Sequence, residues 1–188
     1  EERIAGASEA ELYGLFGLPE IPPELREDRG EIAAAQEGRL PRLVGLADLR
    51  GDLHVHSSDS DGQSGLAELA VAAKALGYGY LAVTDHSQRL GVARGLNAER
   101  LRAQGRAIDK LNGTLGEFVL LKGCEVDILE GGGLDLPDDV LGELDVVVAA
   151  VHSRFELDQK RQTERLIRAM DNRRVNILAH PTGRLIGR

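Results

Sequence analysis

Five histidines and one glutamate recur along this sequence at intervals of about one strand plus one helix. They are His54, His56, His86, Glu125, His152 and His180. Imidazole is the commonest nitrogen ligand of transition metals in proteins, and a carboxylate can bridge two ions. A lone histidine near a strand end is more often a hydrogen-bonded structural residue, but a whole series in corresponding positions favours a metal centre.

The spacing of these residues indicates how they meet. The successive intervals are 32, 39, 27 and 28 residues for the series His54, His86, Glu125, His152 and His180. Strand ends on one side of a parallel barrel or open sheet converge on one site. Residues two apart on a strand project from the same face, so His54 and His56 suit a single ion. We therefore expect the whole series to lie together in the folded chain.

Three further residues near this series are open to more than one interpretation. Asp61, in Ser60-Asp61-Gly62, suits a turn and a metal ligand equally. Asp85, next to His86, is a candidate for orienting an imidazole or for capping a helix or a loop. Cys124 lies in an apolar stretch, where a lone thiol is usually a packing residue, so no nucleophile is predicted there.

Polar residues after the later predicted strands are candidates for contacting a phosphate. Ser153 and Arg154 follow His152, and Arg184 follows His180. A guanidinium binds phosphate oxygens well, although serines are common in any loop. The glycine run 131–133 lacks the spacing of a phosphate-binding loop and predicts a hairpin turn instead.

Alternating strand and helix patterns would place these side chains. Residues 52–56 are short and β-prone, and apolar stretches predict further strands at 80–84, 118–126, 146–151 and 175–179. Helical patterns lie between them at 64–76, 97–111, around Val140 and at 159–170. Ser64 and Asn97 are the expected N-caps of the first two helices, and Leu76 completes the apolar face of the first before Gly77 ends it. Fully apolar strands such as 80–84 are typical of parallel sheets, so the predicted class is α/β.

The first 48 residues have a different character. Three of the six prolines lie within 17–26, and Pro-Pro favours an extended backbone. Short helices are expected at 8–16, with Ser8 as N-cap and Glu11 completing a capping box, and at 30–37. We interpret 1–48 as the tail of a preceding domain plus a linker, and 49–188 as the domain that carries the chemistry. Because the sequence begins with Glu1 rather than Met, we expect a piece of a longer protein.

Composition narrows the possible functions. The 188 residues are 42% hydrophobic and 29% charged, which suits a globular protein with a real core. No apolar run approaches the length of a membrane span, and no secretory signal is visible. The single cysteine fits a reducing cytoplasm. A net charge of −8 disfavours a free-standing nucleic-acid binder, although bound cations would offset clustered carboxylates.

Taken in order, these motifs resemble those of the PHP (polymerase and histidinol phosphatase) superfamily. The stretches that carry the likeness are Asp52–Ser57, Ser60–Gly62, Val83–Ser87, Gly123–Asp127, Val151–Ser153 and Leu178–Pro181. The resemblance covers about residues 49–188. It implies a distorted (βα)7 barrel, incomplete in this sequence with about five βα units present, and a site for three metal ions at the carboxyl ends of the strands.

The flanking residues resemble the junction before the PHP domain in bacterial family X DNA polymerases. The stretches are Ile21–Glu27, Gly30–Ile32, Leu40–Val44 and Asp48–Leu53. This resemblance implies a manganese-dependent 3′→5′ exonuclease of a DNA repair polymerase, that is, a hydrolase joined to a nucleotidyltransferase. DNA would be gripped mainly by a polymerase core outside this sequence, and a cytoplasmic monomer is expected.

Carried over residue by residue, the resemblance divides the predicted ligands among three ions. His54, His56 and Glu125 would hold the first, Asp61 and His86 the second, and Glu125, His152 and His180 the third. His54, His56, Glu125 and His152 would also act in catalysis. The implied ion is Mn2+, with Zn2+ and Fe2+ as alternatives. The late Asp-x-His of the family pattern is missing from this sequence, so fewer than three tightly bound ions are expected.

Two other functions remain open at this point. A phosphomonoesterase of the histidinol-phosphatase type would use the same centre on small phosphate esters. A domain whose ions only stabilise the fold is the non-enzymatic alternative, although a degenerate site has less reason to retain all five histidines.

Overall fold

The computed structural model describes residues 6–181 and divides the chain into two compact units, Glu1–Asp48 and Leu49–Arg188. The first unit contains two short α-helices, α1 (Glu9–Leu15) and α2 (Glu31–Gln36), and 3-10 turns at Pro23–Leu25 and Leu46–Asp48. Among its described residues, the buried apolar side chains are Ile21 and Ala35. The described part of this unit therefore has only a small apolar core.

The start of α1 differs in one respect from the expected capping box. The Ser8 hydroxyl accepts the backbone N–H of Glu11 at 3.3 Å, as predicted for the N-cap. The Glu11 carboxylate, however, accepts the N–H of Ala7 at 2.9 Å instead of that of Ser8. The reciprocal half of the predicted box is therefore wrong, because the carboxylate reaches past the N-cap to the residue before it.

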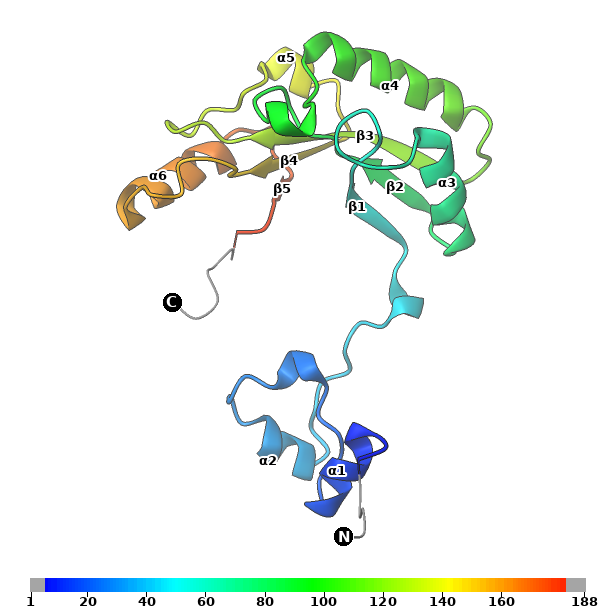
Figure 1. Cartoon of the computed structure of the whole chain (residues 1–188), viewed down its shortest axis with the longest axis vertical. Coiled ribbons are helices and arrows are strands. Elements are labelled where there is room, and N and C mark those ends of the chain that lie inside the picture. The colour runs from blue at the N-terminus through cyan, green and yellow to red at the C-terminus, as the bar shows by residue number, and fades with distance from the viewer. Residues whose placement is uncertain (1–5, 182–188) are drawn as a thin grey trace. The chain divides into compact units, whose positions relative to one another are not determined.

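The second unit is built on five parallel strands. They are β1 (Gly51–Val55), β2 (Tyr80–Val83), β3 (Val119–Asp127), β4 (Val146–Ala150) and β5 (Ile177–Leu178). Their order in the sheet is β1-β2-β3-β4-β5, and every neighbouring pair is parallel. A doubly wound sheet reverses its order at a switch point, whereas a barrel keeps the sequential order. The curled sheet in Figure 1 is thus consistent with an incomplete (βα) barrel.

Helices connect these strands. They are α3 (Leu66–Ala75), α4 (Ala98–Asn112), α5 (Asp138–Leu141) and α6 (Gln159–Met170). Asn97 caps α4 as predicted, with its side-chain oxygen 2.9 Å from the N–H of Arg100. The cap of α3 was predicted one residue early: Gly65 is the N-cap, and its N–H donates to Glu68 at 3.0 Å. None of the helices between residues 6 and 181 is long and apolar enough to cross a membrane.

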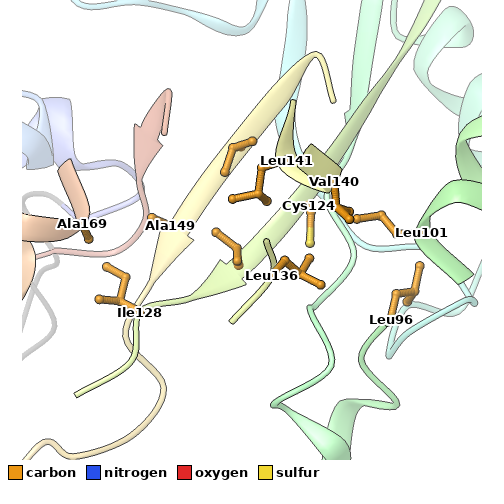
Figure 2. Packing of buried hydrophobic residues seen from close by; sticks show 11 residues of the cluster. Leu96, Leu101, Cys124, Ile128, Leu136, Val140, Leu141, Ala149 and Ala169 are labelled. Carbon is orange, nitrogen blue, oxygen red and sulfur yellow. The ribbon is translucent and has the colours of Figure 1, made fainter. Parts of the chain in front are cut away.

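The hydrophobic core fixes the helices to one face of the sheet. Figure 2 shows its main part, where side chains of β3 and β4 pack against α4, α5 and α6. Cys124 lies within this packing, and burial raises the pKa of its thiol well above the ordinary value. The predicted packing role of Cys124 agrees with this position. Leu76 was expected on the buried face of α3, but it is 70% exposed, because it follows the last turn of the helix.

Close strand packing brings the carboxyl ends of β2 and β3 together. A Cβ at Gly123 would lie 2.9 Å from the carbonyl oxygen of Val83 and 2.8 Å from the methyl group of Thr84. Only glycine therefore permits this approach. Beyond it, His86 and Glu125 form a parallel bridge although they are 39 residues apart in sequence.

Candidate metal centre

Glu125 lies at the middle of the histidines, near the end of β3, and is only 2% exposed. Its Oε2 atom lies 3.2 Å from His54 Nε2, 3.1 Å from His56 Nε2 and 3.1 Å from His86 Nδ1. Its Oε1 atom lies 3.2 Å from His152 Nε2 and 2.9 Å from His180 Nε2. Three imidazoles thus face one carboxylate oxygen and two face the other. We call Glu125 and the five histidines the histidine cluster.

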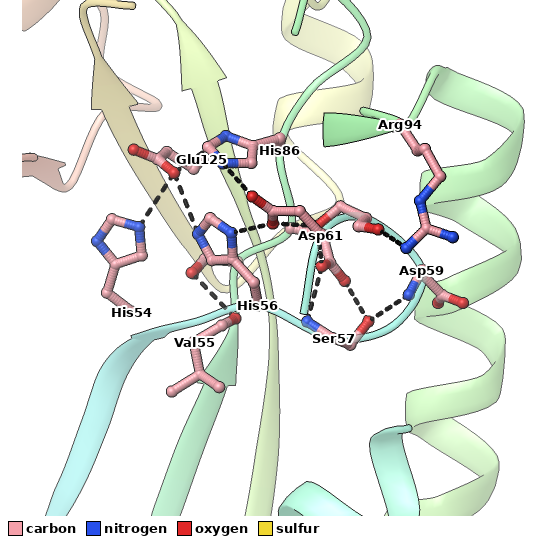
Figure 3. Close-up of polar contacts among 12 residues, drawn as sticks. His54, Val55, His56, Ser57, Asp59, Asp61, His86, Arg94 and Glu125 are labelled. Carbon is pink, nitrogen blue, oxygen red and sulfur yellow. Dashed lines mark hydrogen bonds and ion pairs between the residues drawn. The ribbon is translucent and has the colours of Figure 1, made fainter. Parts of the chain in front are cut away.

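The strand ends explain why these residues converge. His54 belongs to β1 and His56 follows it, so both rings project from one face and stack with centroids 5.3 Å apart. His86, His152 and His180 lie two or three residues beyond β2, β4 and β5. Figure 3 shows His54, His56 and His86 directed at the Glu125 carboxylate. The predicted convergence of the series is thus what the structure shows.

Asp61 joins the centre from the loop after β1. Its Oδ1 lies 2.8 Å from His56 Nδ1, and its Oδ2 lies 3.4 Å from His86 Nε2. The adjacent Gly62 lets the loop fold back, since a Cβ there would overlap the carbonyl oxygens of His56 and Ser57. Asp61 thus lies in a turn and also beside His56 and His86.

The donor set suits divalent transition-metal ions. Three groups have ligand atoms within 4.8 Å of one another: His54, His56 and Glu125; His56, Asp61 and His86; and His86, Glu125 and His152. In the part of the chain that the structure describes, His86 Nδ1 is the buried side-chain atom that forms no hydrogen bond, although Glu125 Oε2 lies 3.1 Å from it. A buried polar atom left unpaired is costly, and a bound cation would satisfy it. Mixed imidazole and carboxylate ligation fits manganese, iron or zinc.

These groups divide the residues differently from the resemblance. His56 belongs to two groups, and His86 also belongs to two. His180 contacts the shared Glu125 and has half of its side chain exposed. One carboxylate thus faces all five rings, and the group His54, His56 and Glu125 is the set that the resemblance assigns to the first ion.

Hydrogen bonding in the cluster changes the affinity of its rings for protons. The bond to Glu125, followed by that to Asp61, raises the pKa of His56 to about 9. Burial alone would raise the pKa of Glu125, but bonds from His152, His54 and His56 outweigh it and lower that pKa. Burial lowers the pKa of His86. The metal-free centre therefore holds protons that a cation must displace.

Asp127 is a site residue that the sequence analysis did not assign. Its Oδ1 lies 2.5 Å from His152 Nδ1, and the residue is 3% exposed. This contact is the leading cause that raises the pKa of His152 to about 9. The available signal was spacing, because Asp127 is two residues beyond Glu125 on the same strand and projects from the same face. Asp127 thus orients an imidazole, a role that was considered for Asp85 instead.

Asp85 supports a loop rather than an imidazole. It is fully buried and accepts the N–H of Ser57 at 2.8 Å and the Ser57 hydroxyl at 2.5 Å. The Ser60 hydroxyl and the Gln104 amide also donate to it. Of its two predicted roles, loop capping is therefore the one that the contacts support. Nothing in the local sequence pointed to Gln104, which lies in the middle of α4.

The phosphate candidates lie in different surroundings. Arg154 has a positive φ of 57° and forms ion pairs with Glu130 at 3.2 Å and Glu156 at 3.5 Å. The Ser153 carbonyl accepts a hydrogen bond from Arg165 at 2.8 Å. Arg184 lies outside the described residues.

The glycine run 131–133 forms the predicted turn. The N–H of Leu129 donates to the Gly133 carbonyl at 2.7 Å, and Gly132 has a φ of 86°. The antiparallel bridge between Ile128 and Leu134 closes this hairpin. The segment therefore forms no phosphate loop.

Residues 52–178 match the model of the PHP domain family, and this chain belongs to that family. It is 50% identical over 181 residues to the DNA polymerase/3′-5′ exonuclease PolX of Bacillus subtilis (strain 168). The aligned region covers 96% of this chain and 31% of that protein. It is also 34% identical over 136 residues to a probable phosphatase of Thermoanaerobacter sp. (strain X514), covering 69% of this chain and 53% of that protein. A probable phosphatase of Syntrophotalea carbinolica is 29% identical over 134 residues, covering 69% of this chain and 53% of that protein.

These relatives support a hydrolase domain of the metal-dependent phosphoesterase kind. The family match and the clustered His, Glu and Asp side chains point to metal binding. The chain spans about a third of the length of PolX and about half the length of these phosphatases.

Proposed function

We propose that this domain hydrolyses phosphodiester bonds at DNA 3′ ends in the 3′→5′ direction, as part of a longer family X DNA polymerase that acts in DNA repair. The observation that carries the proposal is the histidine cluster around Glu125, with Asp61 beside it. The PolX relative supports DNA as the substrate. In this proposal residues 1–48 are the tail of the polymerase part plus a linker, and 49–188 are the phosphoesterase domain, a monomer of the cytoplasm.

The residues that would hold the ions are those facing Glu125, together with Asp61. They are His54, His56, Asp61, His86, Glu125, His152 and His180. Divalent cations, for which we propose Mn2+, supply Lewis-acid activation of water and neutralise charge on a phosphate. DNA is held mainly by the polymerase part, because a chain with a net charge of −8 has little attraction of its own for a polyanion.

The protein's own groups prepare the centre for this chemistry. Asp127 accepts a hydrogen bond from Nδ1 of His152, which leaves Nε2 of that ring facing Glu125, where it would bind an ion once its own proton is displaced. Asp61 orients the His56 ring in the same way through Nδ1. Glu125 remains an anion among the rings because its pKa is lowered by their hydrogen bonds. The positions of His54, His56, Glu125 and His152 are thus held before any substrate arrives.

The site residues differ in exposure. Glu125 is deeply buried, whereas the side chains of His54, Asp61 and His180 are 34%, 45% and 52% exposed. The inner part of the centre is therefore shielded while its outer part faces solvent. We propose Ser153, Arg154 and Arg184 as the contacts to the phosphates of the substrate.

The test uses both the 188-residue chain and the longer protein that carries it. Each is incubated with Mn2+ and a duplex with a recessed, labelled 3′ end. Shortening from the 3′ end is expected mainly for the longer protein, because its polymerase part holds the DNA. Glu125→Gln, which keeps shape but removes charge, should abolish it. Asn112→Ala on α4 is the control, because Asn112 bonds only the backbone of Leu120, away from the centre. Undiminished shortening by the Glu125→Gln variant would remove this centre from the mechanism.

A phosphomonoesterase is the second candidate, and the phosphatase relatives favour it. The same preparations are assayed on small phosphate monoesters in parallel with the labelled duplex. Faster turnover of the monoesters, lost in the Glu125→Gln variant, would support this alternative. Metal-dependent stabilisation without turnover of either substrate would favour a structural role.

A further inference from the structure

The loop of residues 57–61, which carries Asp61, is held by an unusually dense set of polar contacts. Asp85 accepts the Ser57 N–H, the Ser57 hydroxyl and the Ser60 hydroxyl. The N–H of Ser60 donates to the Ser57 carbonyl at 3.2 Å. Asp61 itself is the exposed end of this loop, and its carboxylate must be placed against His56 and His86. The loop therefore depends on buried support behind it.

Gln104 of α4 supplies that support. Its side chain is 4% exposed, and its amide nitrogen donates to Asp85 Oδ2 at 2.5 Å and to Asp59 Oδ2 at 2.8 Å. A primary amide has two N–H groups, so one is available for each carboxylate. Gln104 thus joins the buried anion at the end of β2 to the loop after β1 without adding charge.

Two arginines strengthen the same attachment from outside. Arg100 is one turn before Gln104 on α4 and donates to the Asp59 carbonyl at 2.6 Å. Arg94, just before this helix, donates to the Ser60 carbonyl. Figure 3 shows Arg94 directed at the loop that carries Asp59 and Asp61. Residues four apart lie on one face of a helix, so α4 presents Arg100 and Gln104 together to the loop.

From these contacts we infer that Gln104 is a positioning residue for Asp61, acting through Asp85 and Asp59. It touches no substrate and none of the residues proposed as ligands. The inference rests on the proposed metal centre, because the position of Asp61 matters for the function only if Asp61 holds an ion. Contacts that orient a metal ligand are worth about tenfold or more in metal affinity.

The first test needs no metal. Backbone amide exchange is measured by NMR for residues 57–62 in the wild type, in Gln104→Leu and in Asn112→Leu. Asn112 is the matched control, since it is also an amide of α4 but bonds Leu120 of β3. We expect about tenfold faster exchange at 57–62 in Gln104→Leu only, with the amides of β4 unchanged. Unchanged exchange at 57–62, or an equal increase in Asn112→Leu, would overturn the inference.

The second test measures Co2+ binding by its visible absorption. Gln104→Leu and Asp61→Ala should each weaken the weakest resolved step of Co2+ binding about tenfold. The double variant should bind Co2+ no more weakly at this step than Asp61→Ala alone. Additive losses would contradict a role through Asp61. If the wild type takes up no Co2+, the proposed function fails, and the exchange experiment alone decides the role of Gln104. If Gln104→Leu does not fold, Arg100→Ala replaces it, and a smaller increase in the amide exchange rate at 57–62 is expected. No increase in that rate would count against the inference.

Discussion

Asp127 Oδ1 lies 2.5 Å from Nδ1 of His152, whose other nitrogen lies 3.2 Å from Glu125. One ring therefore bridges two carboxylates that are two residues apart on β3. This arrangement fixes the orientation of His152 and raises its pKa to about 9.

Replacing Asp127 by alanine should free the His152 ring. We expect the pKa of His152 to fall from about 9, because the hydrogen bond to Asp127 that raises it most is removed. Metal affinity should fall by about tenfold or more. NMR titration of the histidine ring protons and a Mn2+ binding isotherm measure the two effects. Asp139→Asn, on the exposed surface of α5, is the control. An unchanged pKa of His152 would show that Asp127 does not control this ring.

The stability of the metal-free chain should fall as the pH rises from neutral. His56 and His152 have pKa values raised to about 9 in the folded state. Groups with raised values stabilise the fold fully below their unfolded pKa, about 6.5, and lose that contribution as the pH passes through about 9. Thermal unfolding in the presence of a chelator at pH 6.5 and pH 9 measures the effect. A melting temperature that rises over this range would contradict the assignment.

The affinity of the centre for metal should rise as the pH rises from neutral. Histidine binds metal in its neutral form, so protons on His56 and His152 compete with the ion. Ordinary histidine values would place this competition below about pH 7. The raised values extend it to about pH 9, so Mn2+ should bind more tightly at pH 8.5 than at pH 7. Calorimetry should also show proton release on binding at pH 7, and an affinity independent of pH would argue against histidine ligation.

Gly62 should not tolerate a side chain. A Cβ at this position would overlap the carbonyl oxygens of His56 and Ser57, so Gly62→Ala should destabilise the domain by about 2 kcal/mol or more. Gly91→Ala is the matched control, because no atom lies within 4 Å of its added Cβ. Urea unfolding of both variants tests the difference. Equal stabilities would mean that the loop after β1 relaxes at little cost.

Arg165 should contribute strongly to stability although it lies outside the histidine cluster. It is 1% exposed and donates to the carbonyls of Leu129 at 2.9 Å, of Ser153 at 2.8 Å and of Ile128. Arg165→Met would leave these acceptors unpaired and should cost about 3 kcal/mol. Arg161 is on the same helix as Arg165 and forms an exposed ion pair with Glu130. Arg161→Ala should therefore cost less than about 1 kcal/mol of stability. Similar urea midpoints for the two variants would refute this difference.

Local patterns in the sequence were enough to predict the alternation of strands and helices and the residue types that gather at the centre. Apolar stretches predicted β2 and β4, because a strand buried on both faces must be apolar throughout. The partly exposed β1 was predicted from its β-prone residues. The interval of about one strand and one helix then placed His54, His86 and Glu125 at equivalent strand ends. Errors were confined to element ends, as at Ser64 and Leu76, where a shift of one residue changes the cap or the exposed side.

Only the tertiary structure decided which atoms meet. That three rings face one oxygen of Glu125 and two face the other depends on strand register and side-chain rotamers, which involve residues up to 71 positions apart. The attachment of Gln104 to Asp85 and the burial of Arg165 among carbonyls likewise join distant segments. Each of these residues looks ordinary in its local sequence. Their roles arise because folding removes water from polar groups, which must then find partners wherever the packed chain brings them.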